Sequence, residues 1–201
     1  MSTEKTSQVV YDNREETDLS RYNNDWFRAK LRSAGSPLKI LLWHFTNAWL
    51  FNSYAPLPSG LKVSLLRAFG ATVGVGVLIK PAVNIKYPWL LSIGDHVWIG
   101  EGVWIDNLAQ VTLGNHVCLS QGAMLLTGNH DYRSVTFDLK VAPIHLENGA
   151  WIGAKAIVCP GIRVESHAIL AVGSVATQTM EAYTIYQGNP AVAVRKRVIN
   201  A

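Results

Sequence analysis

An aliphatic residue recurs every six positions through most of this 201-residue chain. The spacing matches neither the 3.6-residue period of a helix nor the two-residue alternation of a strand. It is typical of a solenoid, in which each six-residue unit forms one side of a coil. Fourteen such positions, all Ile, Leu or Val, form four unbroken runs: Val73, Ile79 and Ile85; Ile93, Ile99 and Ile105; Leu113, Leu119 and Leu125; and Leu146, Ile152, Val158, Val164 and Leu170.

Two other positions of the unit agree with this interpretation. Glycine follows the leading aliphatic residue five times, where we expect a turn with unusual dihedral angles. Small residues stand four positions after the leading residue, as a narrow interior requires. Three units make a coil of about eighteen residues, stacked on the next at about 4.8 Å. The glycines are Gly74, Gly94, Gly100, Gly114 and Gly153, and the small residues are Ala109, Ala123, Ala150, Ala156, Ala168 and Ser174.

The first seventy residues lack the repeat and predict helices. The stretch 1–20 is polar, which predicts a surface tail, and a helix is expected to begin near Asn23. Ser36 and Pro37 form a typical helix start, an N-cap followed by proline, before an apolar run that ends at Phe51.

A shorter helix is expected from Leu61 to Phe69, with Gly70 as its C-terminal cap and Arg67 in its last turn. The chain therefore divides into three parts. We expect a tail and helices that pack on the solenoid over 1–70, the solenoid itself over 71–190 with a loop over 131–145, and a C-terminal helix or tail over 191–201.

Composition limits the function classes. The net charge of +4 and isoelectric point near 9.1 suit a phosphorylated ligand but are too mild to indicate nucleic-acid binding. Cys118 and Cys159 show neither metal-ligand spacing nor a disulfide framework, so the expected location is a reducing cytoplasm. The stretch 1–21 does not have the composition of a secretory signal.

The most apolar early stretch runs from Leu38 to Phe51. Its length of about fourteen residues falls short of the roughly twenty that span a bilayer. The simpler interpretation is a helix packed on its own domain. The alternative is peripheral contact with the inner face of a membrane, through side chains such as Trp43, Phe45 and Trp49.

The repeat breaks at its longest interruption after Leu125, and His130 stands at that break. Binding and catalytic groups concentrate on loops held by rigid elements, so we regard His130 as a catalytic candidate. The alternative is a turn histidine, because His is tolerated at tight corners. We assign that second role to the histidines three residues after a leading aliphatic residue, which are His96, His116 and His167. For His145, packing and acceptor contact both stay open.

Four stretches resemble the motifs of the hexapeptide-repeat acyltransferases. They are Ile-Gly-Asp-His-Val-Trp at 93–98, Leu-Thr-Gly-Asn-His-Asp-Tyr at 126–132, Gly-Ala-Trp-Ile-Gly-Ala at 149–154 and Gly-Asn-Pro-Ala at 188–191. Within that family the chain is similar to sugar O-acetyltransferases. Residues 65–71, Pro88-Trp89 and His130-Asp131 resemble the colanic-acid-type exopolysaccharide branch, and galactoside and maltose acetyltransferases are slightly more distant.

The resemblance implies a left-handed parallel β-helix, a homotrimer with shared sites, and acetyl-CoA as the acetyl donor, with no metal. His130 would act as general base on an acceptor hydroxyl that attacks the thioester directly. Asp131 or a main-chain carbonyl would orient its ring. A backbone N–H near Gly153 and Ala154 would stabilise the negative charge that develops on the thioester oxygen.

Trp151 would lie beside the pantetheine and the acceptor. The family also places an asparagine in the coil before the histidine, but its aligned position here falls near Gly100. Asp106 and Asn107 are the candidates to replace it. Trp98 and Trp104 are expected to be covered by the N-terminal helices or by another subunit.

Coenzyme A would lie along the coils, mostly on backbone atoms, with a basic residue near the chain end neutralising its phosphates. Gln178 stands where the family often has lysine, which removes one charge contact. The cluster 195–197 also fits a solvated helix face. The implied coenzyme A positions are Gly153, Ala154, Val172, Gly173, Ser174, Thr177, Gln178 and Arg195.

Three alternatives to a sugar O-acetyltransferase stay open. The first is an N-acetyltransferase of an amino sugar or nucleotide sugar, which would use the same histidine on an amine. The second is a protein like the γ-carbonic anhydrases, which bind zinc through three histidines, although the spacings here offer no evident third ligand. The third is a trimeric scaffold without catalysis. The sequence does not name the acceptor, which could be free, nucleotide-linked or lipid-linked.

Overall fold

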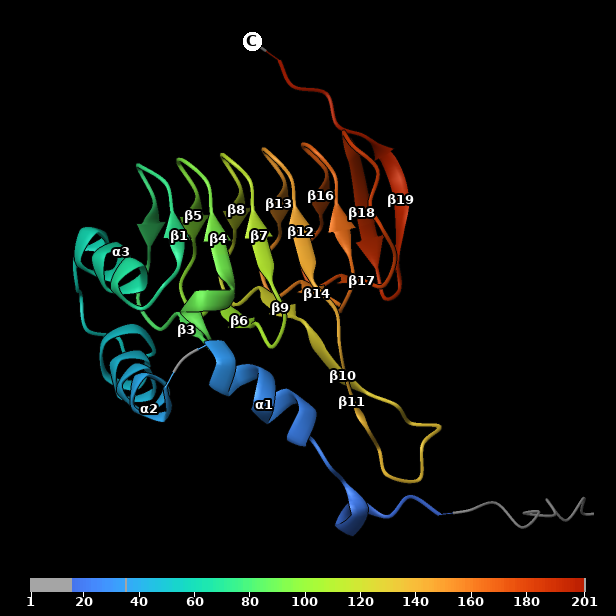
Figure 1. Ribbon diagram of the computed structural model, residues 1–201. Coiled ribbons are helices and arrows are strands. Elements are labelled where there is room, and N and C mark those ends of the chain that lie inside the picture. Colours follow the sequence, from blue (N-terminus) through green and yellow to red (C-terminus); the bar gives the residue numbers. More distant parts are fainter. Residues whose placement is uncertain (1–15, 35, 201) are drawn as a thin grey trace, which may run out of the picture.

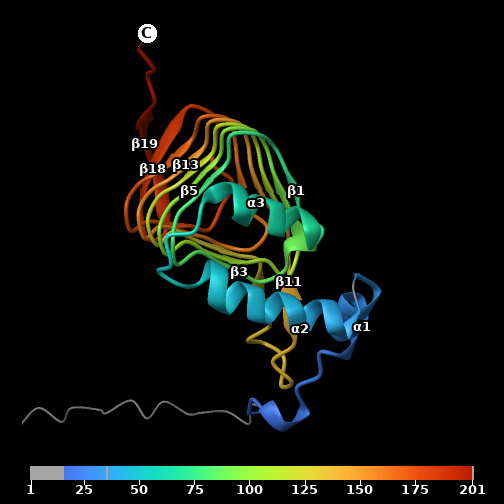
Figure 2. The same cartoon turned by 90° about the vertical axis from the view of Figure 1, so that its left-hand side faces the viewer.

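The protein is a three-sided parallel β-solenoid of about six turns, with helices at its N-terminal end (Figure 1). This computed structural model describes residues 16–34 and 36–200. Most of the tail expected over 1–20 and the last residue, Ala201, lie outside the described residues. Figure 2, which looks along the solenoid, shows the triangular outline of the coils.

Three sheets form the sides of the solenoid. Sheet A contains β1 (Thr72–Val73), β4 (Leu91–Ile93), β7 (Val111–Leu113), β12 (Ile144–Leu146) and β15 (Arg163–Val164). Sheet B contains β2 (Leu78–Ile79), β5 (Trp98–Ile99), β8 (Cys118–Leu119), β13 (Trp151–Ile152), β16 (Ile169–Leu170), β18 (Thr184–Gly188) and β19 (Ala191–Lys196). Sheet C contains β3 (Asn84–Ile85), β6 (Trp104–Asp106), β9 (Met124–Leu126), β14 (Ile157–Val158) and β17 (Val175–Ala176).

The six-residue repeat predicts the core correctly. All fourteen leading aliphatic side chains are buried, and so are the small residues four positions later. The leading residues of one coil pair with those of the next, as Ile79, Ile99 and Leu119 do in sheet B. Burying these stacked aliphatic side chains is the main stabilising contribution to such a fold, at about 25 cal/mol per Å² of apolar surface.

The glycines after the leading residues have a different role from the one predicted. None of these five has a positive φ. Instead, the next coil approaches too closely for a side chain: a Cβ on Gly114 would lie 2.8 Å from the backbone nitrogen of Asn148, and one on Gly153 would lie 2.7 Å from the carbonyl oxygen of Leu170. The turns with positive φ lie elsewhere in the coil, and there the prediction of turn histidines is confirmed. His96, His116 and His167 have φ of 55°, 58° and 60°.

The predicted N-terminal helices are present. They are α1 (Asp25–Ala34), α2 (Pro37–Thr46), which continues as one π-helical turn, η2 (Asn47–Phe51), and α3 (Ser59–Ala68). Short 3₁₀ turns, η1 (Leu19–Arg21) and η3 (Pro88–Leu90), complete the helical elements of the described chain. Ser36 caps α2 through its hydroxyl, which accepts from the N–H of Lys39 at 3.3 Å. Within the described residues, no helix is long and apolar enough to cross a membrane.

Helix side chains close the exposed backbone edge of the first coil. Trp43 is buried and donates from Nε1 to the carbonyl of Ile85 at 2.9 Å. Asn47 accepts from the Ile85 N–H, and Arg67 donates to the Val73 and Gly74 carbonyls. An unpaired edge is a site for uncontrolled strand addition, so this cap protects the solenoid as well as stabilising it.

The expected loop over 131–145 is an antiparallel hairpin that begins and ends earlier. Its strands are β10 (Gly128–His130) and β11 (Leu139–Val141), and His130 pairs with Leu139. The hairpin leaves the corner between sheets C and A (Figure 1). His145 belongs to β12, where it lies between Thr112 and Arg163 on sheet A.

Of the helix or tail expected over 191–201, the helix is wrong for the described residues 191–200. Residues 191–196 form β19, which pairs antiparallel with β18. The stretch Ala-Val-Ala-Val is rich in β-branched residues and follows a turn at 189–190, so it pairs with the free edge of the last coil rather than forming a helix. The basic cluster 195–197 therefore lies at the end of a strand and not on a helix face.

Candidate active site

The imidazole of His130 is fixed by Phe137 across the hairpin. Its Nδ1 lies 2.8 Å from the carbonyl oxygen of Phe137, and the two rings stack with centroids 4.4 Å apart and planes 7° from parallel. A carbonyl oxygen only accepts hydrogen bonds, so Nδ1 carries the proton when the ring is neutral. In this tautomer Nε2 carries no proton, and its lone pair can accept one. A general base needs such an unprotonated nitrogen.

Asp131 is directed at a different partner. Its carboxylate lies 2.7 Å from Nζ of Lys140 and accepts from the N–H of Arg133. The Lys140 hydrogen bond, followed by the Arg133 N–H, holds the pKa of Asp131 below its usual value. Of the two orienting groups that the resemblance implied for His130, the structure places the main-chain carbonyl on the ring and Asp131 on Lys140.

A segment near the start of the described chain lies against the hairpin. The Tyr22 ring is 5.6 Å from the His130 ring, at 56°, and the N–H of Asp18 donates to the carbonyl of Val135 at 2.8 Å. The sequence assigns no role to Tyr22 or Phe137. Neither stands in a recognisable motif, and each is brought to His130 by a contact that local pattern does not encode.

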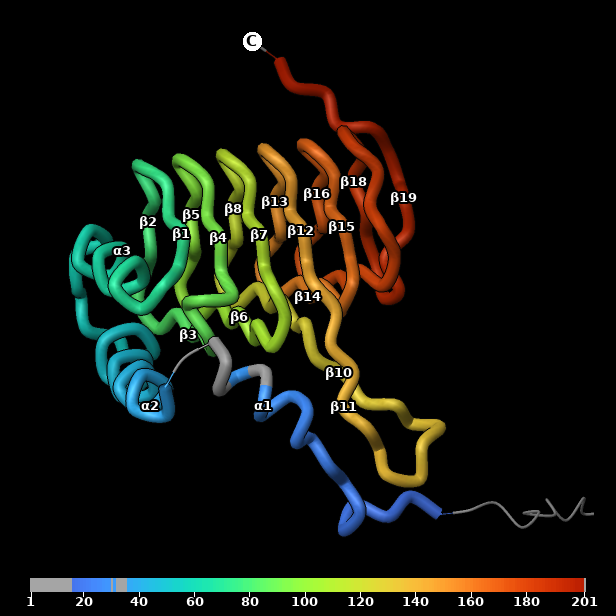
Figure 3. Tube along the Cα trace, viewed as in Figure 1, coloured from blue at the N-terminus to red at the C-terminus, as the bar shows by residue number. Residues whose placement is uncertain are grey.

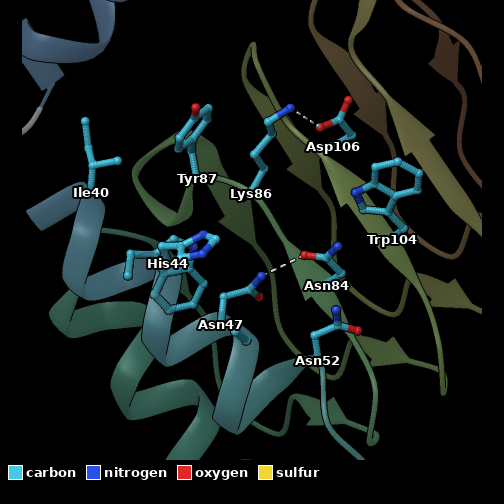
Figure 4. Close-up of a pocket in the computed structure, with 11 residues that line it drawn as sticks. Ile40, His44, Asn47, Asn52, Asn84, Lys86, Tyr87, Trp104 and Asp106 are labelled. Carbon is cyan, nitrogen blue, oxygen red and sulfur yellow. Dashed lines mark hydrogen bonds and ion pairs between the residues drawn. The ribbon is translucent and has the colours of Figure 1, made fainter.

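A cavity of about 370 Å³ lies between α2–η2 and the outer side of sheet C (Figure 4). Asp106 and Trp104 line it, and the Lys86 ammonium lies 2.8 Å from the Asp106 carboxylate. Tyr87 lines it too; burial, and secondarily the charge of Asp106, raises the pKa of its hydroxyl. Aromatic rings beside polar groups are a lining that suits a carbohydrate. Trp104 lies beside the N-terminal helices but is 38% exposed, and Trp98 is 59% exposed, so these helices do not cover either ring as one of the two expectations had it.

The cavity is connected to the hairpin through Asp106. Its carbonyl accepts from both the N–H and the hydroxyl of Thr127, at 3.2 and 2.9 Å. Thr127 stands three residues before His130, which corresponds to about 10 Å of extended chain. The backbone of Asp106 is therefore fixed to the base of the hairpin.

Asn107 is fully buried, and its side-chain amide makes its hydrogen bonds to the backbone. Its Nδ2 donates to the carbonyls of Tyr87 and Leu90, and its Oδ1 accepts from the N–H of Tyr87. Both amide protons are committed to the backbone of the preceding coil. Of the two candidates for the missing family asparagine, only Asp106 faces a cavity.

Trp151 lies on a different side of the solenoid from His130. It is exposed on the outer side of sheet B, where its Nε1 donates to the Ser120 hydroxyl at 2.8 Å. The hairpin leaves the corner between sheets C and A, opposite sheet B (Figure 2). One chain does not bring these two residues together.

Most of the implied coenzyme A positions lie at two corners of the solenoid, the ones that flank sheet C. Figure 3 shows how the chain turns at these corners between β13, β14 and β16. Gly153, Ala154, Val172 and Gly173 lie between sheets B and C in neighbouring coils, where the Gly173 N–H donates to the Ala154 carbonyl at 2.9 Å. The second corner, between sheets C and A, holds Thr177 and Gln178, both exposed.

Two further implied coenzyme A positions, Ser174 and Arg195, have different surroundings. Ser174 is buried and accepts from the N–H of Gly188 at 3.0 Å, so its hydroxyl is used within the fold. Arg195 is exposed on β19 opposite Ile185. Among residues 16–34 and 36–200, no three His, Cys, Asp or Glu side chains gather as a metal site; His96 and His116 stack with centroids 5.3 Å apart.

Known proteins match this chain over most of its length. It is 34% identical over 164 residues to the Escherichia coli (strain K12) protein named as a colanic acid biosynthesis acetyltransferase, WcaF, covering 82% of this chain and 90% of that one. The chain belongs to the hexapeptide-repeat acetyltransferase family. A galactoside O-acetyltransferase of the same bacterium is 25% identical over 150 residues, 73% of each chain. No family model matches the sequence.

The fold of this acetyltransferase has solved counterparts. A hexapeptide-repeat acetyltransferase of Vibrio cholerae, solved in complex with acetyl coenzyme A, superposes with a TM-score of 0.69. That alignment covers 85% of this chain and 89% of the Vibrio chain at 23% identity. The family predicted from the repeat and its motifs is therefore confirmed, while the roles of individual residues are not tested by these matches.

Proposed function

We propose that this acetyltransferase moves the acetyl group of acetyl-CoA to a hydroxyl of a sugar or polysaccharide precursor, with His130 as general base. The observation that carries the proposal is the hydrogen bond between Nδ1 of His130 and the Phe137 carbonyl. It leaves Nε2 free to remove the hydroxyl proton as the oxygen attacks the thioester carbon. The tetrahedral intermediate then collapses, the C–S bond breaks, and the proton passes to the coenzyme A thiolate.

The acceptor is proposed to occupy the cavity beside Asp106 and Trp104. A carboxylate accepts hydrogen bonds from sugar hydroxyls, and an indole ring stacks on the apolar face of a pyranose. The relatives named as a colanic acid biosynthesis acetyltransferase and as a galactoside O-acetyltransferase support this acceptor class. Coenzyme A would run across sheet C between the two corners that hold the implied positions, with Arg195 near its phosphates.

We further propose that a second copy of the chain completes the site. His130 and Trp151 lie on opposite sides of one solenoid. The outer side of sheet B also carries a continuous row of mostly apolar side chains from one coil to the next, which a neighbouring subunit would cover in a trimer. The row consists of Leu78, Trp98, Cys118, Trp151, Ile169 and Ile185.

Turnover of acetyl-CoA against a panel of sugars, nucleotide sugars and lipid-linked oligosaccharides tests the acceptor class. The His130→Ala variant should lose about 10² to 10⁴ of kcat while it still binds coenzyme A. Near-normal turnover by this variant would reject His130 as the base. Preference for an amino sugar, with the acetyl group found on nitrogen, would reject the hydroxyl acceptor but keep the same base.

Mixing inactive subunits tests whether the site is shared. If Trp151→Ala and His130→Ala are each nearly inactive, dissociating and reassembling them together should restore part of the activity, because some interfaces then combine an intact His130 with an intact Trp151. A monomeric mass in solution, or no recovery in mixtures whose exchange is verified by mass, would reject the shared site.

A further inference from the structure

Helix α2 and its continuation η2 carry an apolar stripe that faces away from the solenoid. The spacing of its members places them on one face of a helix. They are strongly exposed, at 63, 52, 51, 45 and 70% of their surface for Leu38, Leu41, Leu42, Phe45 and Trp49. Phe45 and Trp49 pack on each other, with ring centroids 5.5 Å apart.

This stripe is not needed to hold the helix on the solenoid. The opposite face already does so, through the buried Trp43 and Phe51, whose rings lie 5.1 Å apart. A surface helix of a globular protein ordinarily carries polar residues on its outer face. Here both faces are apolar, and the outer one is without a partner in the described chain.

The helical segment that bears the stripe is also the basic part of the molecule. From Asp25 to Phe51 the sequence has four basic residues and one acidic residue, whereas the other 174 residues have 14 basic and 13 acidic ones. Arg28 is exposed on α1, and Lys39 lies over the Trp89 ring. Trp26 and Tyr54, at either end of this region, are exposed as well.

The stripe and the His130 hairpin lie on the same side of the molecule. Figure 2 shows α2 below sheet C, with α1 and the hairpin projecting on that side too. The inner face of α2 forms a wall of the cavity that holds Asp106. A surface that docks on the stripe would therefore lie close to the candidate site.

We infer that the outer face of α2–η2 docks on an anionic phospholipid bilayer, with the helix in the plane of the interface. Exposed Trp, Phe and Leu in a helical segment of net positive charge are the composition of such interfacial elements. Anionic lipid headgroups complement the positive charge of the segment. A symmetric contact between the same faces of two copies is less favourable, because it would bring two basic segments together.

Flotation of the full-length protein with vesicles tests this surface. We expect binding to vesicles that contain phosphatidylglycerol, at least tenfold weaker binding to pure phosphatidylcholine vesicles, and weakening by salt. Phe45→Glu combined with Trp49→Glu should reduce binding at least tenfold, and Arg28→Glu should reduce it specifically on the anionic vesicles. The matched control introduces two glutamates at exposed apolar positions outside the stripe, Val75→Glu with Val198→Glu.

The controls distinguish docking from misfolding and from self-association. Each variant must keep the wild-type melting temperature and oligomeric mass, and Phe45→Glu alone replaces the double variant if that one does not fold. Equal loss of binding in the control pair, or no wild-type binding to anionic vesicles, would overturn the inference. A lower oligomeric mass of the stripe variant without wild-type vesicle binding would assign the stripe to a contact between copies instead. Acetyl transfer to a soluble acceptor is not expected to depend on vesicles, so the proposed function is tested separately.

Discussion

The backbone carbonyl of Phe137 and Nδ1 of His130 lie 2.8 Å apart, across a hairpin whose two strands pair from Gly128 to Val141. Phe137 holds its carbonyl there with φ of 51°, a left-handed conformation that is costly for a bulky residue. Strained residues that persist cluster at functional sites. The stacked ring of Phe137 adds a second restraint on the imidazole plane.

Phe137→Ala should lower kcat about tenfold and leave the KM for acetyl-CoA unchanged. The variant keeps the carbonyl but loses the ring that restrains His130, and misorientation of a base costs rate rather than donor affinity. Steady-state kinetics of Phe137→Ala, His130→Ala and the double variant check this. Because Phe137 acts through His130, its loss should have no effect in the His130→Ala background. Additive losses would show that Phe137 acts on the substrate independently.

Tyr22 covers His130 from the N-terminal side, and its aromatic ring is what makes the contact. Tyr22→Phe should retain most activity, while Tyr22→Ala should lower kcat/KM up to about tenfold, the equivalent of an aromatic pair worth roughly 0.5–1.5 kcal/mol. Tyr132→Ala, at an exposed tyrosine of the same hairpin, is the control and should change little. If Tyr22→Phe is as impaired as Tyr22→Ala, the hydroxyl and not the ring is the functional group.

Asp131→Asn should reduce kcat less than about threefold at neutral pH, because the Phe137 carbonyl and not this carboxylate orients His130. The pKa of Asp131 is lowered in the folded chain. The Lys140 pair therefore stabilises the hairpin above the ordinary aspartate pKa of about 3.9 and is lost as pH falls through the lowered value. Amide exchange over 128–141 should accelerate there in the wild type and less so in Asp131→Asn. The acceleration left in that variant is due to Asp138, whose pKa is also lowered, by hydrogen bonds from Thr136 and Ser134. A large kcat loss at neutral pH would restore Asp131 as an orienting residue.

The sequence predicts the solenoid well because its signal is repeated in every coil. Each leading aliphatic residue is followed by another six positions later, so a single accidental match does not create the pattern and a single mismatch does not hide it. The contacts on His130 lack that redundancy, because each is made by one residue: Phe137 through the hairpin and Tyr22 through the N-terminal segment. Asp131 illustrates the limit: the family resemblance implies either this carboxylate or a main-chain carbonyl as the group that orients His130, and Asp131 instead pairs with Lys140.

Asn107 and Asp106 are neighbours in the sequence but should differ when substituted. Asn107→Ala removes the side-chain partner of the Tyr87 N–H and of the Leu90 carbonyl, each costing about 1–3 kcal/mol, so a marked fall in melting temperature is expected. The Tyr87 carbonyl keeps its hydrogen bond from the Leu90 N–H. Asp106→Asn should leave stability nearly unchanged and raise the KM of the acceptor, because the carboxylate lines the cavity. Thermal unfolding and kinetics on both variants check this. A stable Asn107→Ala protein with a raised acceptor KM would reverse the assignment.

Two glycines of neighbouring coils should respond in opposite ways to the same pair of substitutions. A Cβ at Gly114 would lie 2.8 Å from the Asn148 nitrogen, whereas Gly102 has φ of 67° and the nearest atom to its Cβ position is 3.9 Å away. Forcing a side chain into the packed coil costs roughly 1–3 kcal/mol or more. At Gly102 only the backbone conformation is at stake, and asparagine tolerates it.

Gly102→Asn should therefore remain close to wild type in urea unfolding, while Gly102→Ala should lose about 1 kcal/mol. At Gly114, both alanine and asparagine should be costly, and asparagine the more so, because it is larger and the limiting factor is space rather than φ. Tolerance of asparagine at Gly114 would mean that the glycine is present for its backbone freedom after all. The coils would then have room to move apart, and these glycines would not set the close stacking between them.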